Sequence, residues 1–244
     1  MKNRRTKVLI AVAVAAALAV PGTAVAAEKL FKPKPAEYVS FITGDTANIG
    51  NGVAFGANVA FYKSSGIGPA GNGLPSAQFT AEERLVPLDV FPDFATTHTL
   101  PAGVTITEAQ TINVLKAIGA NLAAAGLTYE DVVDMRVFLQ NPAGEEKMDY
   151  NGFNRGYRQF FANTNLATGA TIDVPLGTGP AAPPLVVNPA RPSRFALEVE
   201  NLPVNGWLVE IQVDAIYPED EPAPKGKKHK RHFGFNGFGW HWSR

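Results

Sequence analysis

The sequence predicts an α+β fold for residues 40–217, in which a β-sheet carries two helices on one face. Two observations predict this fold. Two segments have helical periodicity, near 107–125 and 146–162, and strand-like segments lie before, between and after them. The 244-residue chain contains no internal repeat. Because these elements follow one another without a break, we expect one domain with an additional arm at each end.

The first helix is predicted from its ends and from its apolar spacing. Thr107 and Gln110 fit a capping box, and Gly126 is a typical stop at the C-terminal end. Apolar residues recur between these ends at helical intervals: Ile112, Leu115, Ile118, Leu122 and Ala125. After it, "DMRVFLQ" alternates apolar and polar residues, which predicts a strand that ends at Asn141-Pro142.

The second helix is expected over 146–162, because Phe153, Tyr157, Phe160 and Phe161 share one helical face. Residues 162–193 hold six prolines and three glycines and predict a long loop. Residues 67–106 predict a second long loop.

The last strands are expected to form a β-hairpin over 194–217 that turns at Val204-Asn205. In its first arm Phe195 and Leu197 share one face, and Arg194 lies on the other. Upstream, residues 53–66 predict two shorter strands that turn at 56–58.

Residues 1–26 have the pattern of a secretory signal peptide. Four basic residues precede an apolar run, Val8 to Val20, and Ala24 and Ala26 form a small-residue cleavage site. The run is shorter than the roughly 20 residues that a membrane-spanning helix needs. We therefore expect an exported protein that begins its mature chain with an arm, 27–39. A retained N-terminal anchor is the alternative.

The net charge of zero conceals an acidic body and a basic tail. The signal segment holds four basic residues and the tail from Lys225 holds six, so residues 27–224 carry 12 basic against 22 acidic residues, or about −10. An acidic body argues against nucleic acid as a specific partner. The linker and tail, 218–244, lack periodicity. The tail's basic and aromatic residues predict salt-sensitive binding to an anionic envelope polymer, and a solvated extension is the alternative.

Three segments resemble a known family in their sequence and in their order. They are "AAGLTYEDVVDMRVFL", "NRGYRQFF" and "RFALEVENLP...LVEIQVDAIY", with weaker similarity over 51–66. From about Thr107 to Tyr217 the chain resembles the RidA/YjgF family, also called the L-PSP endoribonuclease family. The resemblance implies a chorismate-mutase-like fold, homotrimers with ligand clefts between subunits, and hydrolysis of 2-imino or enamine acids to 2-keto acids and ammonia. The acidic body disfavours the ribonuclease activity in the family's name.

The resemblance also implies a set of site residues. In this family an arginine binds the substrate carboxylate, and a glutamate on the last strand positions or activates water. These roles fall on Arg194 and Glu210, the family's helix asparagine falls on Asn154, and Gly66 is a further candidate for substrate binding. The text "PAR" makes Arg191 a competitor for the arginine role.

The chemistry suits these residue types. A guanidinium offers two donors in a plane that matches a carboxylate, and a carboxylate can take a proton from water. The chain has no cysteine, which excludes thiolate metal sites, and positioning alone can promote imine hydrolysis. We therefore expect a small carboxylate-bearing ligand, no metal and no cofactor.

Four alternatives stay open. Arg194 can be a salt-bridged strand residue, Glu210 a solvated one and Asn154 a helix-surface residue. Ala196 stands where the family often has Cys, Ser or Thr, which favours a non-catalytic trimeric binding module. In a hairpin Arg194 and Glu210 would lie roughly 15 Å apart, so they would share a ligand only across a subunit boundary.

Overall fold

The computed structural model describes residues 8–11 and 32–218. Most of the predicted signal peptide and almost all of the linker and basic tail lie outside these residues. Within the described ranges, no helix combines the length and the hydrophobicity needed to cross a membrane.

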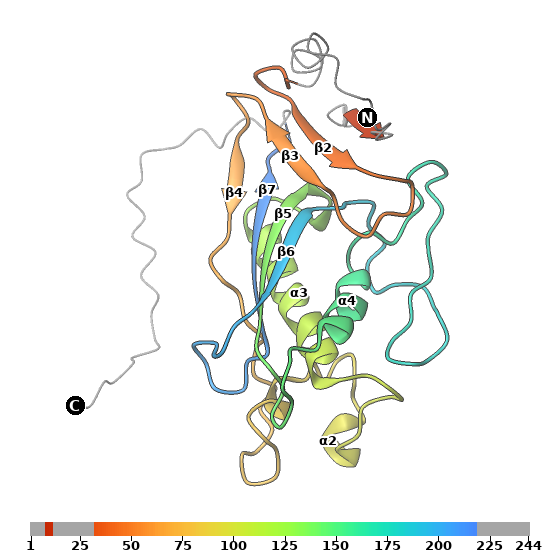
Figure 1. Ribbon diagram of the computed structural model, residues 1–244. Helices are drawn as coiled ribbons and strands as arrows, with labels where there is room; N and C mark the ends of the chain where they lie inside the picture. The colour runs from red at the N-terminus through yellow and green to blue at the C-terminus, as the bar shows by residue number, and fades with distance from the viewer. Residues whose placement is uncertain (1–7, 12–31, 219–244) are drawn as a thin grey trace, which may run out of the picture.

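The centre of the molecule is a mixed four-stranded sheet with the strand order β4-β7-β5-β6 (Figure 1). Its strands are β4 (Phe61–Lys63), β5 (Val132–Leu139), β6 (Ser193–Glu198) and β7 (Val209–Ile216). Strand β7 runs antiparallel to β4 and β5, whereas β6 runs parallel to β5. A smaller sheet contains β1 (Val8–Ala11), β2 (Tyr38–Ile42) and β3 (Gly52–Phe55), and a bridge from Gly50 to Ser193 connects it to β6.

Two helices cover one face of the central sheet, α3 (Ile106–Ala124) and α4 (Tyr150–Arg158) (Figure 1). The core lies between them and the sheet. Met135, Val137 and Leu139 of β5 are fully buried there, in the alternation that the sequence predicted. The α+β fold with both helices on one face is therefore confirmed.

The predicted hairpin over 194–217 is wrong, because β5 lies between its two arms. Strands β6 and β7 pair with opposite edges of β5 and not with each other. The connection 199–208 crosses two strand spacings, roughly 10 Å, which a ten-residue segment spans easily. The two short strands expected over 53–66 also have separate partners, since β3 pairs with β2 and β4 with β7.

Both helices begin at a different residue from the predicted one. Helix α3 is capped by Thr105, whose Oγ1 accepts a hydrogen bond from the Glu108 amide at 3.1 Å. Gln110, expected in the cap, is instead buried and bonds the backbone of Gly206 and Leu208. Helix α4 begins after Asp149, which accepts from the Gly152 amide at 2.8 Å, and is shorter than the predicted 146–162.

The two long loops contain buried anchors. Residues 67–105 include η1 (Glu83–Leu85) and α2 (Phe94–Thr97), and Asn113 of α3 bonds the backbone of Ala70 and Leu85. In the second loop the buried Asn188 donates to the Phe160 carbonyl and accepts from the Ala190 amide, both at 2.9 Å. Asn188 therefore fixes the chain just before β6.

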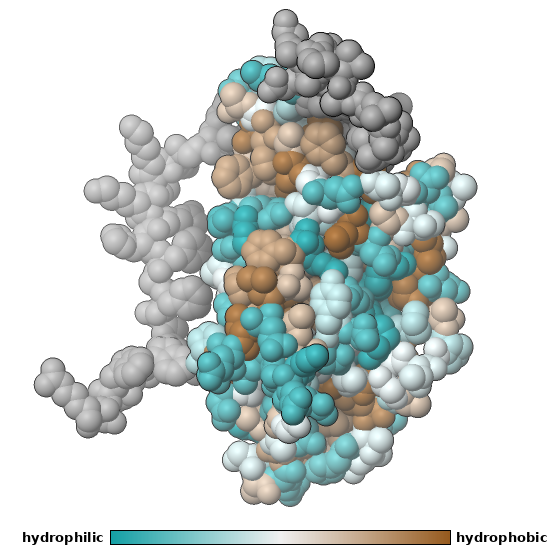
Figure 2. Space-filling view, in the orientation of Figure 1, coloured by the Kyte–Doolittle hydropathy of each residue, from teal (hydrophilic) through white to brown (hydrophobic). Residues whose placement is uncertain are grey.

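The sheet face opposite α3 and α4, called the open face below, carries exposed apolar side chains. Phe195 and Leu197 of β6 are 46% and 49% exposed. Arg136 of β5 lies on the same face, where it pairs with Asp134 and Asp214 at 3.1 Å. Figure 2 shows apolar side chains gathered over the strands in the centre of the view.

Replacement of Gly156 in α4 by alanine should destabilise the fold. An added methyl group would lie 2.8 Å from the Thr111 Cβ and 2.9 Å from the Glu108 carbonyl of α3, so the helices would have to separate. We expect the loss to exceed the gain in helix propensity and to reach about 1–3 kcal/mol in urea unfolding. Gly52→Ala, where a methyl group meets nothing within 4 Å, is the control. Equal stabilities of the two variants would contradict this close approach.

Candidate functional site

The register of β6 decides which way Arg194 points. Arg194 pairs with Met135 of β5, and Met135 pairs with Val213 of β7, and both of these partners are buried. Since paired residues share a sheet face, Arg194 faces α4, whereas Phe195 faces the other way.

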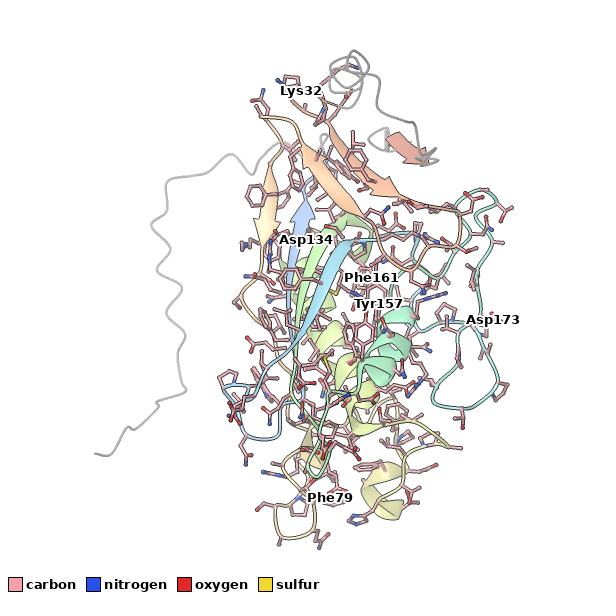
Figure 3. All side chains as sticks on the ribbon, in the orientation of Figure 1. Lys32, Phe79, Asp134, Tyr157, Phe161 and Asp173 are labelled. Atoms are coloured by element: carbon pink, nitrogen blue, oxygen red, sulfur yellow. The ribbon has the colours of Figure 1, made fainter. Side chains whose placement is uncertain are left out.

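The guanidinium of Arg194 lies over aromatic rings of α4. Its central carbon is 4.4 Å from the centre of the Tyr157 ring, 5.0 Å from that of Phe153 and 6.0 Å from that of Tyr150. Burial raises the pKa of Tyr157, so its phenol stays neutral beside the cation. Each such contact is worth about 0.5–2 kcal/mol and holds the plane of the guanidinium. Figure 3 shows Tyr157 between β6 and α4.

Asn154 orients the same guanidinium from its edge. Its Oδ1 accepts a hydrogen bond from Nη2 of Arg194 at 2.8 Å, and its Nδ2 donates to the Tyr150 carbonyl at 2.9 Å. The Tyr150 hydroxyl accepts a longer bond from the same Nη2, at 3.3 Å. Asn154 therefore joins helix α4 to Arg194.

Two donors of Arg194 have no partner. Its Nε and Nη1 are buried and form no hydrogen bond. No acidic side chain within residues 8–11 and 32–218 forms an ion pair with it, so the salt-bridge alternative has no support in the described chain. A buried cation with unpaired donors costs free energy, which an anion bound at those donors would offset. Of the two, Nη1 lies at the end of the guanidinium, where a carboxylate oxygen can accept a charge-assisted hydrogen bond.

Arg191 has a different environment. It is 3% exposed, and its guanidinium donates to the backbone carbonyls of Ala47, Pro189, Asp45 and Thr164. Burial lowers its pKa, but these carbonyls satisfy its donors. Arg191 thus joins the start of β6 to the loop after β2, and its donors are not available to a ligand. Its predicted role in substrate binding has no support in this geometry.

Glu210 and Gly66 lie together on the open face. Glu210 of β7 pairs with Phe138 of β5. Beside it the chain bulges, because Ser64 bonds Val213 while Ile67 bonds Ile211. Gly66 lies in this bulge against the Glu210 carboxylate, and any side chain at Gly66 would overlap that carboxylate.

Arg194 and Glu210 cannot bind one ligand within a single chain. They point to opposite faces of the sheet, with β5 between their strands. Along the strands they are three pairs apart, which adds roughly 10 Å. The structure therefore brings together Arg194 with Asn154, and separately Glu210 with Gly66.

A family model with the description Endoribonuclease L-PSP matches residues 95–217, which include α3, α4 and three strands of the central sheet. The chain belongs to the L-PSP endoribonuclease, or RidA/YjgF, family. Comparison with curated proteins found no significant sequence match.

Similar solved structures come from several bacteria. A YjgF/YER057c/UK114 family member from Mycobacterium tuberculosis is 18% identical, with 74% of this chain and 100% of that chain covered, at a TM-score of 0.35. A YjgF family protein from Neisseria meningitidis is 20% identical over 75% and 96%, at 0.33. TdcF from E. coli, solved with bound serine, is 21% identical over 71% and 91%, also at 0.33.

Sequence reasoning missed Tyr150, which contacts Arg194, and Arg158, which lies beyond Asn154 in the neighbouring groove. Tyr150 lies one helical turn before Asn154 on the same face of α4, and Arg158 lies one turn after it, so the helical repeat was a usable signal. Within the described chain, no group of three His, Asp or Glu side chains comes close enough to hold a metal ion.

The two neighbouring arginines should differ in their effect on stability. Arg191→Met would remove the Arg191 donor from the backbone carbonyls of Ala47, Pro189 and Thr164, whereas the Asp45 carbonyl keeps the Leu166 amide, and we expect a loss of about 3 kcal/mol. Arg194→Met removes two unpaired buried donors and should stay within about 1 kcal/mol of the wild type or exceed it. Urea unfolding measures both. Similar losses would mean that Arg194 is also a structural residue.

Proposed function

We propose that this protein binds a small 2-imino or enamine acid through its carboxylate and hydrolyses it to a 2-keto acid and ammonia. One observation carries the proposal: Arg194 lies on aromatic rings with two buried donors unpaired, and Asn154 orients its guanidinium. Nη1 and Nη2 at the end of a guanidinium form the planar fork that matches two carboxylate oxygens, and Nη1 of Arg194 is one of the unpaired donors.

A carboxylate at Arg194 would bind with little loss of freedom. The rings of Tyr157 and Phe153 already hold the guanidinium, so the side-chain entropy is lost on folding and not on binding. The same rings exclude water, which strengthens the charge-assisted bonds. The ligand's C2 atom would then lie next to the edge of β6.

The second half of the site would come from a neighbouring subunit of a homotrimer. Glu210 faces away from Arg194 in its own chain, and the open face on which it lies carries the exposed Phe195 and Leu197. Covering such a face by association is favourable. A partner's Glu210 carboxylate, held by the bulge at Gly66, would then approach the ligand at Arg194 from the opposite side.

The reaction needs a positioned water molecule. Water attacks C2 of the protonated imine, and the Glu210 carboxylate accepts the proton that the water loses. Glu210 then returns that proton to the nitrogen of the carbinolamine, the C2–N bond breaks and ammonia leaves. The hydroxyl proton passes to the Glu210 carboxylate as the C2 carbonyl forms, and from there to ammonia, which is released as ammonium. One water is consumed, and one keto acid and one ammonium are produced.

A non-catalytic binding module is the second candidate, and one observation favours it. Ala196 pairs with Val137 and faces the same side as Arg194, but its methyl side chain offers no hydrogen bond to a ligand. Binding without turnover is the expected result if this candidate is right.

Imine hydrolysis should depend on Arg194. We expect the protein to speed keto-acid and ammonia release from enzymatically generated 2-imino acids, and Arg194→Ala to lower the rate roughly ten- to a hundred-fold, since a bond to a charged group is worth about 1.5–3 kcal/mol. Lys116→Ala, which removes a charge on α3 that pairs with Asp89, is the control.

The controls separate the two candidates. Binding of serine that depends on Arg194, with no release of keto acid above the free reaction, would support the binding module. Equal rates for wild type and Arg194→Ala would remove Arg194 from the mechanism.

Assembly should depend on the open face. Leu197→Asp places a charge on this face, and we expect it to convert a trimer into monomers in analytical ultracentrifugation at micromolar concentration. Leu185→Asp is a matched control, because Leu185 is equally exposed, at 47% against 49%, but lies in the long loop. A monomeric wild type, or a trimer that Leu197→Asp leaves intact, would contradict the shared site.

A further inference from the structure

A groove adjoins the Arg194 site on the far side of Asn154. It lies between α4 and the long loop before β6. The residues that line it are Asn154, Arg155, Arg158, Ile172, Asp173, Val174 and Pro175. Asn154 lines the groove and also accepts a hydrogen bond from Arg194, so it separates the groove from the Arg194 guanidinium. In Figure 3 Asp173 lies on the loop beside α4, away from the sheet.

Three arginines surround the buried Tyr157. Burial raises the pKa of Tyr157, and the positive charges of Arg194, Arg191 and Arg158 act against that rise. Arg191 donates only to backbone carbonyls. The positive charge at this end of α4 is therefore high in a body that is otherwise acidic.

Arg158 is poorly paired for a half-buried cation. Its Nη1 donates to Oδ1 of Asn48, and its Nε is buried without a partner. Within the described chain it forms no ion pair. Arg155 differs, because its Nε bonds the buried carboxylate of Glu108 at 2.8 Å. Arg158 is thus the groove residue with charge to offer an anion.

We propose that the groove is a second anion subsite and that the ligand of this protein is a dicarboxylate, with one carboxylate on Arg194 and the other on Arg158. The proposal rests on the proposed function, because it assigns the first carboxylate to Arg194. It narrows the substrate class to imino acids with an acidic side chain.

The spacing suits a short chain. Asn154 and Arg158 are one helical turn apart, so their Cβ atoms are about 5–6 Å apart, and Asn154 bonds Arg194 directly. A four- or five-carbon dicarboxylate passing over Asn154 can therefore reach both guanidinium groups. Asp173 is exposed at the rim, where its charge opposes a second anion and limits affinity. Replacement of Asp173 by asparagine should therefore strengthen the binding of a dicarboxylate.

The test compares succinate with butyrate, which differ by one terminal carboxylate, in calorimetric titrations of the intact protein. Succinate should bind about tenfold more tightly than butyrate, the value of one partly exposed charge-assisted contact. Arg158→Met should abolish this preference and leave butyrate binding unchanged. Asp173→Asn should increase the preference, and Arg194→Met should weaken both acids.

Asn48→Ala controls for structure, because it removes the side-chain partner of Arg158 and keeps the guanidinium. It should retain the preference for succinate, and thermal unfolding should show Arg158→Met to be folded. Equal binding of the two acids, or a preference for succinate that persists in Arg158→Met, would contradict the subsite at Arg158 and leave the carboxylate site at Arg194 standing. If neither acid binds, or if Arg194→Met changes nothing, the carboxylate site at Arg194 fails and the subsite fails with it.

Discussion

The parallel pairing of β6 with β5 is the constraint on which the site depends. It sets Arg194 opposite Met135 and Phe195 opposite Arg136, so neighbouring residues of one strand serve opposite faces. A register slip of one residue would turn Arg194 to the open face and Phe195 into the core. The position of the guanidinium over α4 and the apolar character of the open face are therefore two results of one register.

Periodic patterns in the sequence predicted the parts of the fold that depend on local order. The alternation in β5 identifies its buried residues, because each repeat presents one side to the core. The helical repeat of α3 identifies its apolar core residues but not the burial of the whole stretch from Thr107 to Leu115, whose polar side chains bond the long loop. The strand order was not predictable in the same way. β6 and β7 are adjacent in sequence and look like a hairpin, and only the long-range pairing with β5 separates them.

The candidate site was likewise predictable only in the features that depend on local sequence. The residue type of Arg194 and its place on a strand were visible in the sequence, but Arg191 carries a similar local pattern. What distinguishes the two arginines is where their donors go, and that depends on carbonyls from Asp45, Ala47 and Thr164, far away in sequence. Arg194 keeps two donors unpaired, which lowers the free energy of unfolding. The packing of α3, α4 and β5 offsets this loss.

The anchoring of the chain before β6 has an evolutionary consequence. Asn188 and Arg191 fix the backbone at the end of the long loop through bonds to Phe160 and to the loop after β2. Changes of length or sequence upstream, around 172–175, need not move Arg194, because these anchors lie between the two. The proposed carboxylate contact at Arg194 would then stay in place while substitutions in the loop change the residues that contact the rest of the ligand.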